Sequence, residues 1–123
     1  MAGKKTWFIV DGYRPPKQEN GVAKYEGHEA IMILNCNKTD AHCLIDVFYE
    51  DKAPITGIKY TAPAQRISCF RTDDKCVFGD VELKVCEQYS LRVRSDIDVI
   101  VQYGRADVNQ TNLAYIGLLG YSE

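Results

Sequence analysis

Apolar residues recur at every second position along most of this chain, and that alternation limits the folds open to it. No long stretch carries apolar residues at helical spacing, so we expect an all-β protein. Alternating segments predict strands at 6–10, 28–34, 42–49, 56–61, 65–71, 81–86, 89–94, 99–105 and 113–119, with turn-forming residues between them. Eight or nine short strands favour a single-domain antiparallel β-sandwich, with a small barrel as the alternative.

Length and charge narrow the classes of function. The chain has 123 residues and 46% hydrophobic content, which suits one domain over residues 1–123. Its formal net charge of -2 supplies no chain-wide basic surface for phosphate binding, so nucleic acid is not expected as the main partner. The apolar run before Asp11 is too short for a signal peptide or a membrane span, and we expect a cytoplasmic protein.

The five cysteines favour reduced thiols over a disulfide or metal framework. Their number is odd and no two are spaced as CxxC. Cys43, Cys69 and Cys86 lie inside predicted strands, where we expect them to be buried as small hydrophobic residues.

The segments at 28–35 and 40–54 read as two strands joined by a turn containing Asn and Asp. If they form a hairpin with Leu34 opposite His42, one face is a core stripe that ends in Glu29 and Tyr49. That stripe contains Ile31, Ile33, Cys43, Ile45 and Val47. Polar residues on these apolar strands, namely Glu29, His42 and Asp46, must be paired internally, be exposed, or contact a polar partner from outside.

Catalytic and metal chemistry find little support. In the predicted hairpin the only two histidines lie roughly 20 Å apart, and His28-Glu29 is not followed by the second histidine of an HExxH motif. His42 and Cys43 point to opposite faces of a strand, which argues against a nucleophilic pair. Phosphate-binding glycine motifs and a GxSxG sequence are also missing. We therefore expect that the protein is not an enzyme and that it binds neither a metal ion nor a cofactor.

A second polar group occupies residues 99–107. Gln102 interrupts an apolar face, Arg105 ends the strand and Asp107 follows, a set that suits hydroxyls or a carboxylate. Taken alone, this set favours a structural role, with Arg105 paired to Asp107 and Gln102 bonded to a neighbouring backbone. Arg66, near a strand end, is also more typical of a solvated side chain. The long loop at 11–27 fits a functional loop and a crossing between sheets equally well.

Seven short sequence motifs, found in order along the chain, resemble those of the microbial sensory rhodopsin transducer family. They are W-x4-GY-x-PP (Trp7, Gly12, Tyr13, Pro15, Pro16), HE (His28, Glu29), ILN (Ile33, Leu34, Asn35), DAH (Asp40, Ala41, His42), Y-x-DK-x-P (Tyr49, Asp51, Lys52, Pro54), PA-x-R (Pro63, Ala64, Arg66) and VQ-x2-R-x-D (Val101, Gln102, Arg105, Asp107). The chain differs from the family pattern at Tyr103, where a histidine is expected, and in the segment from Thr72 to Cys86.

The resemblance implies a cytosolic β-sandwich that forms a homotetramer and has no known catalytic activity. One member couples to the cytoplasmic face of a photoreceptor, relatives are thought to bind sugars or related metabolites, and a DNA-binding role has been proposed. A mixed apolar face containing Met32, Leu44 and Phe48 also favours self-association.

Two functions follow as hypotheses. The first is a sensor for a small polar metabolite, namely a sugar or sugar-like compound, whose pocket draws on six residues: Glu29, Asn35, Tyr49, Arg66, Gln102 and Arg105. The second is an adaptor that docks a membrane receptor tail or a regulator without any ligand. The polar residues on core-facing strands favour the sensor. We expect Glu29, Arg66, Gln102 and Arg105 to converge at one end of the sandwich, with Tyr49 packed against the ligand.

Overall fold

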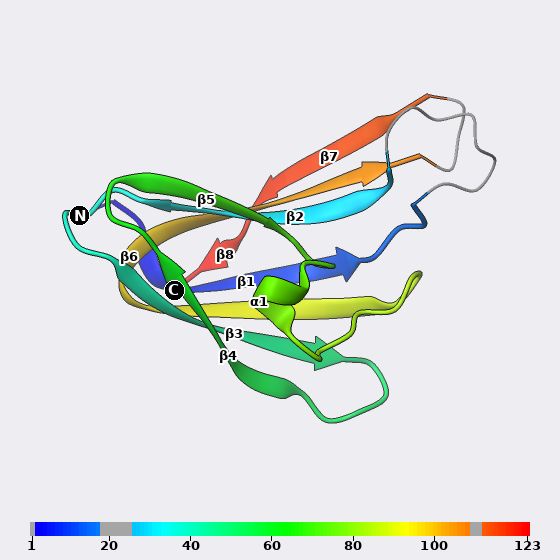
Figure 1. The fold of residues 1–123 in the computed structure, drawn as a ribbon, viewed down its shortest axis with the longest axis horizontal. Coiled ribbons are helices and arrows are strands. Elements are labelled where there is room, and N and C mark those ends of the chain that lie inside the picture. Colours follow the sequence, from blue (N-terminus) through cyan, green and yellow to red (C-terminus); the bar gives the residue numbers. More distant parts are fainter. Residues whose placement is uncertain (1, 18–25, 109–111) are drawn as a thin grey trace.

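The computed structural model describes residues 2–17, 26–108 and 112–123, and these residues form eight strands and one helical turn (Figure 1). The prediction of an all-β chain is confirmed. The elements are β1 (Lys4–Tyr13), β2 (His28–Asn35), β3 (Ala41–Tyr49), β4 (Ile55–Ala62), β5 (Arg66–Arg71), α1 (Lys75–Phe78), β6 (Gln88–Asp107), β7 (Ala114–Leu119) and β8 (Tyr121–Ser122). Residues 18–25 of the predicted loop lie outside the described part, so its role stays open.

Two antiparallel layers share the long strand β6, and together they make the predicted sandwich (Figure 1). The first half of β6 lies between β3 and β1 in the order β4-β3-β6-β1-β8, which we call the β3 sheet. The second half pairs with β2 and β7 in the order β5-β2-β6-β7, which we call the β2 sheet. The β3 sheet ends in open edges at β4 and β8, so the barrel alternative is wrong.

The predicted hairpin has the right faces but the wrong partners. Leu34 lies opposite Ile67 of β5 and Ile100 of β6, while His42 lies opposite Thr61 of β4. β2 and β3 therefore belong to different sheets and face each other across the core. Alternation fixes which side chains point inward, but it is satisfied equally well by a pair within one sheet and a pair across two sheets.

β6 also corrects the sequence prediction. The strands expected at 89–94 and 99–105 are one strand of 20 residues, and the polar segment between them is a bend rather than a turn. At the bend, Thr6 pairs with Arg94 but Lys4 pairs with Val99, so β6 carries extra residues against β1. The segment predicted as a strand at 81–86 is irregular.

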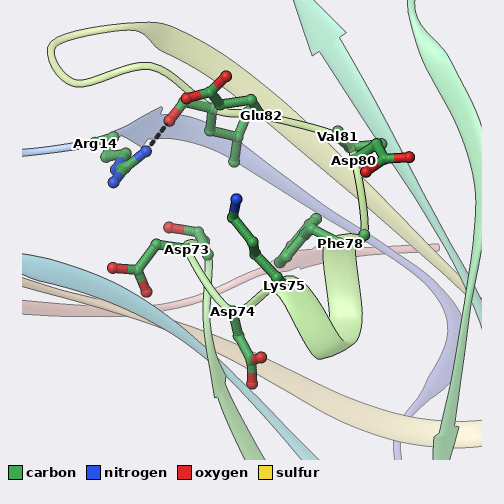
Figure 2. A pocket seen from close by; sticks show the side chains of 11 residues that line it. Arg14, Asp73, Asp74, Lys75, Phe78, Asp80, Val81 and Glu82 are labelled. Carbon is green, nitrogen blue, oxygen red and sulfur yellow. Dashed lines mark hydrogen bonds between the residues drawn. The ribbon is translucent and has the colours of Figure 1, made fainter.

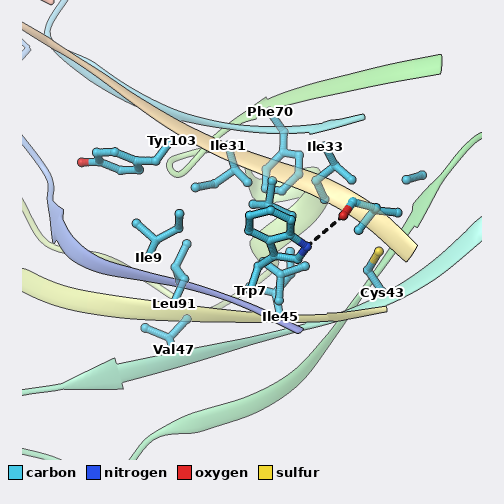
Figure 3. Packing of buried hydrophobic residues seen from close by; sticks show 14 of the residues in the cluster. Trp7, Ile9, Ile31, Ile33, Cys43, Ile45, Val47, Phe70, Leu91 and Tyr103 are labelled. Carbon is cyan, nitrogen blue, oxygen red and sulfur yellow. Dashed lines mark hydrogen bonds between the residues drawn. The ribbon is translucent and has the colours of Figure 1, made fainter. Parts of the chain in front are cut away.

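The core lies between the two sheets, and Figure 3 shows its centre. Trp7 is buried, and its indole N–H donates to the carbonyls of Val99 (2.9 Å) and Lys4 (3.0 Å) near the β6 bend. The expected core stripe is fully buried on both strands. All five cysteines are free thiols, but only Cys43 is buried; Cys69 and Cys86 are exposed, which corrects their placement.

Candidate functional site

Glu29 lies at the centre of a buried polar cluster at one end of the sandwich. Its side chain is 1% exposed. One carboxylate oxygen, Oε2, accepts hydrogen bonds from the hydroxyls of Tyr103 (2.5 Å) and Tyr89 (2.7 Å) and from the backbone N–H of Tyr13 (3.0 Å). The other oxygen accepts from the Thr72 hydroxyl at 2.8 Å. We call these five residues the Glu29 cluster.

The Glu29 cluster ties together strands from both layers. Tyr89 comes from the half of β6 that lies in the β3 sheet, and Tyr103 from the half that lies in the β2 sheet. Burial raises the pKa of both phenols, and the neighbouring Glu29 carboxylate raises them further, so both remain protonated donors. A carboxylate that accepts four hydrogen bonds is solvated by the protein in place of water.

Arg105 lies beside the Glu29 cluster. It is directly opposite Glu29 in the pairing of β2 with β6, so the two side chains leave the sheet on the same face. The Arg105 guanidinium lies over the ring of Tyr13, 5.6 Å from its centroid, and its Nη2 is 3.9 Å from the Asp11 carboxylate. Arg105 therefore covers this end of the sandwich and has a charged partner within the chain.

A pocket of about 330 Å³ adjoins the cluster through Thr72 (Figure 2). Its wall follows the segment from Thr72 to Leu83, which includes α1, and is completed by Arg14, whose guanidinium donates to the carbonyl of Leu83. Asp74 caps α1 by accepting from the N–H of Cys76, and Gly79 ends it at a positive φ of 59°. The lining is mainly charged, with acidic side chains of Asp73, Asp74, Asp80 and Glu82 and basic ones of Arg14 and Lys75.

The structure does not bring the six predicted residues to one place. Glu29, Arg105 and Tyr49 lie toward the same end, and Tyr49 is opposite Tyr89 in the pairing of β3 with β6. Asn35 lies at the other end of β2, roughly 20 Å from Glu29. Arg66 is opposite Asn35 at that far end, and Gln102 is exposed on the outer face, so the expected convergence of both with Glu29 is wrong.

The other predicted residues have structural surroundings of their own. The buried Asn35 amide donates to the carbonyls of Thr39 and Ala62, both at 3.0 Å, and fixes the turn after β2. Arg66 is exposed, and its guanidinium donates to the carbonyl of Gln65. Gln102 is exposed on the outer face of the β2 sheet, opposite Met32 and Leu119.

Sequence reasoning missed Thr72, Tyr89 and the pocket segment. Tyr89 stood in a predicted strand, but its nearness to Glu29 depends on the pairing of β6, which alternation does not specify. Thr72 and the residues after it belong to the segment that departs from the family pattern. That departure indicated a local difference from the family, but it did not predict a pocket.

The part of the chain that the structure describes contains neither a cluster of metal ligands nor a membrane-spanning helix. Within residues 2–17, 26–108 and 112–123, no three His, Cys, Asp or Glu side chains group closely enough to hold a metal ion. In the same described ranges no helix has the length and apolar character needed to cross a bilayer.

The fold is that of a small all-β domain in which two sheets share one long strand. Comparison with known proteins gives the family. The family model described as Anabaena sensory rhodopsin transducer matches residues 2–122, and this chain belongs to that family. No curated protein sequence matches it.

The solved structures similar to this chain include the following two. Thermotoga maritima 1070 is 25% identical, with a TM-score of 0.84 over 100% of this chain and 97% of that one. The Anabaena sensory rhodopsin transducer is 30% identical, with a TM-score of 0.67 over 82% of this chain and 87% of that one. These comparisons confirm the resemblance to the sensory rhodopsin transducer family that the seven sequence motifs indicated.

Proposed function

We propose that this chain is a cytoplasmic signalling adaptor that docks onto a membrane photoreceptor or a related regulator without catalysis. The observation that carries the proposal is the family match over residues 2–122, together with a 30% identical structure named as a sensory rhodopsin transducer. An adaptor needs surface for partners rather than a reaction centre, and the outer faces of the two sheets supply it.

The outer face of the β2 sheet supports self-association into the expected homotetramer. Leu34 and Ile67 are neighbours on this face, 40% and 67% exposed, and Leu119 of β7 is 62% exposed. Tyr115, 61% exposed, lies across Gly104, where any Cβ would meet its hydroxyl. Met32 is on this face, whereas Leu44 and Phe48 are on the outer face of the β3 sheet, so the single mixed face predicted for them is wrong. Contiguous exposed apolar area of this kind marks interaction sites.

Light scattering on the full chain tests the assembly. We expect a mass four times that of the chain, lowered by Leu119→Glu but kept by Val85→Glu, which places the same charge at an exposed apolar site in the irregular segment. A parent mass equal to one chain at every concentration contradicts the homotetramer.

Binding to a receptor tests the adaptor role itself. A sensory rhodopsin in lipid nanodiscs is titrated with the full chain in the dark and under illumination, with a retinal protein that has no transducer as the control. We expect saturable binding to the sensory rhodopsin only. Equal signals with both retinal proteins contradict the adaptor role.

A metabolite sensor is the second candidate, and the pocket beside Thr72 is the observation that favours it. Its charged lining suits a hydroxylated ligand such as a sugar or a sugar acid, which Lys75 and Arg14 would meet with donors. Glu29 adjoins this pocket through its hydrogen bond with Thr72, while Asn35, Arg66, Gln102 and Arg105 are not among its lining residues. Thermal-shift screening against sugars and sugar acids tests the idea, because a ligand that binds only the folded state raises the melting temperature. A hit that Lys75→Ala leaves unchanged places the ligand elsewhere.

A further inference from the structure

Two arginines on the outer face of the β3 sheet are held by one buried carboxylate. Asp46 of β3 is 0% exposed although its side chain points away from the core stripe. One oxygen accepts from Nε of Arg92 (2.7 Å) and Nε of Arg94 (2.8 Å), and the other from Nη2 of Arg94 (2.8 Å) and the N–H of Gly57 (2.9 Å). Asp46 thus fixes the positions of both guanidinium groups on the sheet.

The Arg92 guanidinium keeps its outer edge available. Asp46 binds only its Nε, and among the described residues its two terminal nitrogens have no hydrogen-bond partner. The group lies over the Phe48 ring, 5.2 Å from the centroid, and its side chain is 33% exposed. A planar guanidinium that is fixed at Nε and stacked on a ring presents its two terminal N–H groups in the geometry that binds a carboxylate.

The surroundings of this pair are cationic and aromatic. Leu44 lies between Arg94 and the exposed Lys59, and beside them a hollow of about 290 Å³ is lined by β3 and β4, including His42 and Thr61. On the other side, Phe8 is opposite both Arg92 and Tyr121, and the two rings are 6.3 Å apart.

The charge at the centre of this face has the opposite sign to that of the whole chain. Arg92, Arg94 and Lys59 lie at the centre of this face, and the carboxylate there is that of Asp46, which leaves a local net charge of +2 in a chain of net charge -2. Asp96 and Glu123 lie at the margins of the layer, where Asp96 accepts from the N–H of His42 and the N–H of Glu123 donates to Thr6.

We infer that this arginine face (Arg92, Arg94, Lys59, with Phe8, Phe48 and Tyr121) docks an acidic segment of a partner protein that carries aromatic or aliphatic side chains among its carboxylates. The inference deepens the adaptor function and rests on it. Carboxylates meet the Arg92 edge and Lys59, and apolar side chains lie on the exposed rings. A peptide with a few carboxylates needs only this local charge. A nucleic acid carries a phosphate at every residue and is disfavoured by the net negative charge of the rest of the chain.

Fluorescence anisotropy with a labelled synthetic peptide of alternating Glu and Leu or Tyr residues tests this docking on the full chain. A peptide with Gln in place of each Glu is the reference. We expect the acidic peptide to bind at least about tenfold more tightly, and more weakly as salt is raised. The double variant Arg92→Gln/Lys59→Gln should lose about tenfold or more in affinity for the acidic peptide.

The matched control is Arg66→Gln/Lys38→Gln, which removes the same charge from exposed positions outside the β3 sheet. It should change the affinity by less than about twofold. Lys59→Gln alone serves as the second variant, because Lys59 forms no hydrogen bond or ion pair with the described residues and its loss leaves Asp46 paired. It should weaken binding without changing the melting temperature.

Three results overturn the inference: equal binding of the acidic and Gln peptides, equal losses in the test and control variants, or tighter binding of a single-stranded oligonucleotide through the same residues. The receptor titration separates this inference from the adaptor role. If the receptor binds the parent and Arg92→Gln/Lys59→Gln equally well, the adaptor role stands, but docking on the arginine face is contradicted. If the chain binds the acidic peptide through Arg92 but binds no receptor, the arginine face is supported and the adaptor role is contradicted.

Discussion

Replacing Tyr103 with Phe removes one hydroxyl from the Glu29 cluster and nothing else. The lost hydrogen bond, 2.5 Å long, is made to a buried carboxylate, and bonds to charged groups contribute about 1.5 to 3 kcal/mol. Glu29 keeps its bonds from Tyr89, Thr72 and the Tyr13 N–H, so the charge is not left without partners. We therefore expect Tyr103→Phe to lower the free energy of unfolding by about 2 kcal/mol, or about 8 °C in melting temperature.

Urea unfolding followed by Trp7 fluorescence measures the effect, because Trp7 is the single tryptophan and is 4% exposed in the core. Tyr115→Phe is the matched control, since it removes a hydroxyl from a side chain that is 61% exposed. It should stay within about 0.5 kcal/mol of the parent. If Tyr103→Phe is as stable as Tyr115→Phe, the hydrogen bond from Tyr103 to Glu29 does not stabilise the fold.

Three further perturbations test the contacts of the two buried carboxylates, Glu29 and Asp46. The pKa values of Tyr89 and Tyr103 are raised in the folded state, so their contribution to the free energy of unfolding is complete below about pH 10. Above that pH it falls by about 1.4 kcal/mol per pH unit for each group. Urea unfolding should therefore show a smaller loss of stability at alkaline pH for Tyr103→Phe than for the parent. Burial would raise the pKa of Asp46, but hydrogen bonds from its two arginines and a backbone N–H outweigh burial and lower it to about 2. The parent should therefore lose about 2 kcal/mol more than Asp46→Asn as the pH falls from about 5 to about 2, and equal acid titrations would contradict this. Gly12→Ala would place a Cβ 2.6 Å from the Tyr89 ring, which Glu29 holds in place. It should lower the free energy of unfolding in urea by about 1 to 3 kcal/mol. Gly117→Ala is the control, because its Cβ would have its nearest contact at 3.5 Å and should change the stability little.

Alternation in the sequence was sufficient to predict the strand content and the inward faces. Ile31, Ile33, Ile45 and Val47 are all buried as expected, because a period of two reports directly which side of a strand meets the core. Strand partners were not predictable in this way. The segment 95–98 is polar and reads as a turn, yet the bend there carries β6 from one sheet to the other, and this bend decides the neighbours of β2 and β3.

The candidate site shows the same limit. Glu29 stood out because a carboxylate on a core-facing strand needs partners. Three of its four donors come from residues 43 or more positions away in the sequence, namely Thr72, Tyr89 and Tyr103, so they could be found only once the pairing was known. Asn35 was chosen for the same polarity, but its amide donates to the carbonyl of Thr39 in the following turn and to that of Ala62 at the end of β4.

The polar residues on the two central strands have their partners within the chain. Glu29 accepts four hydrogen bonds, Asp46 binds two arginines and a backbone N–H, and His42 is exposed. Burying these groups therefore needs no ligand to satisfy them, which removes the main argument that the sequence offered for a sensor. The chemistry left facing outward is apolar on the β2 sheet and cationic with aromatic rings on the β3 sheet. Broad faces of this kind suit contact with other proteins better than recognition of a small molecule, which favours concave sites. The proposed adaptor role thus accounts for the surfaces as well as for the family.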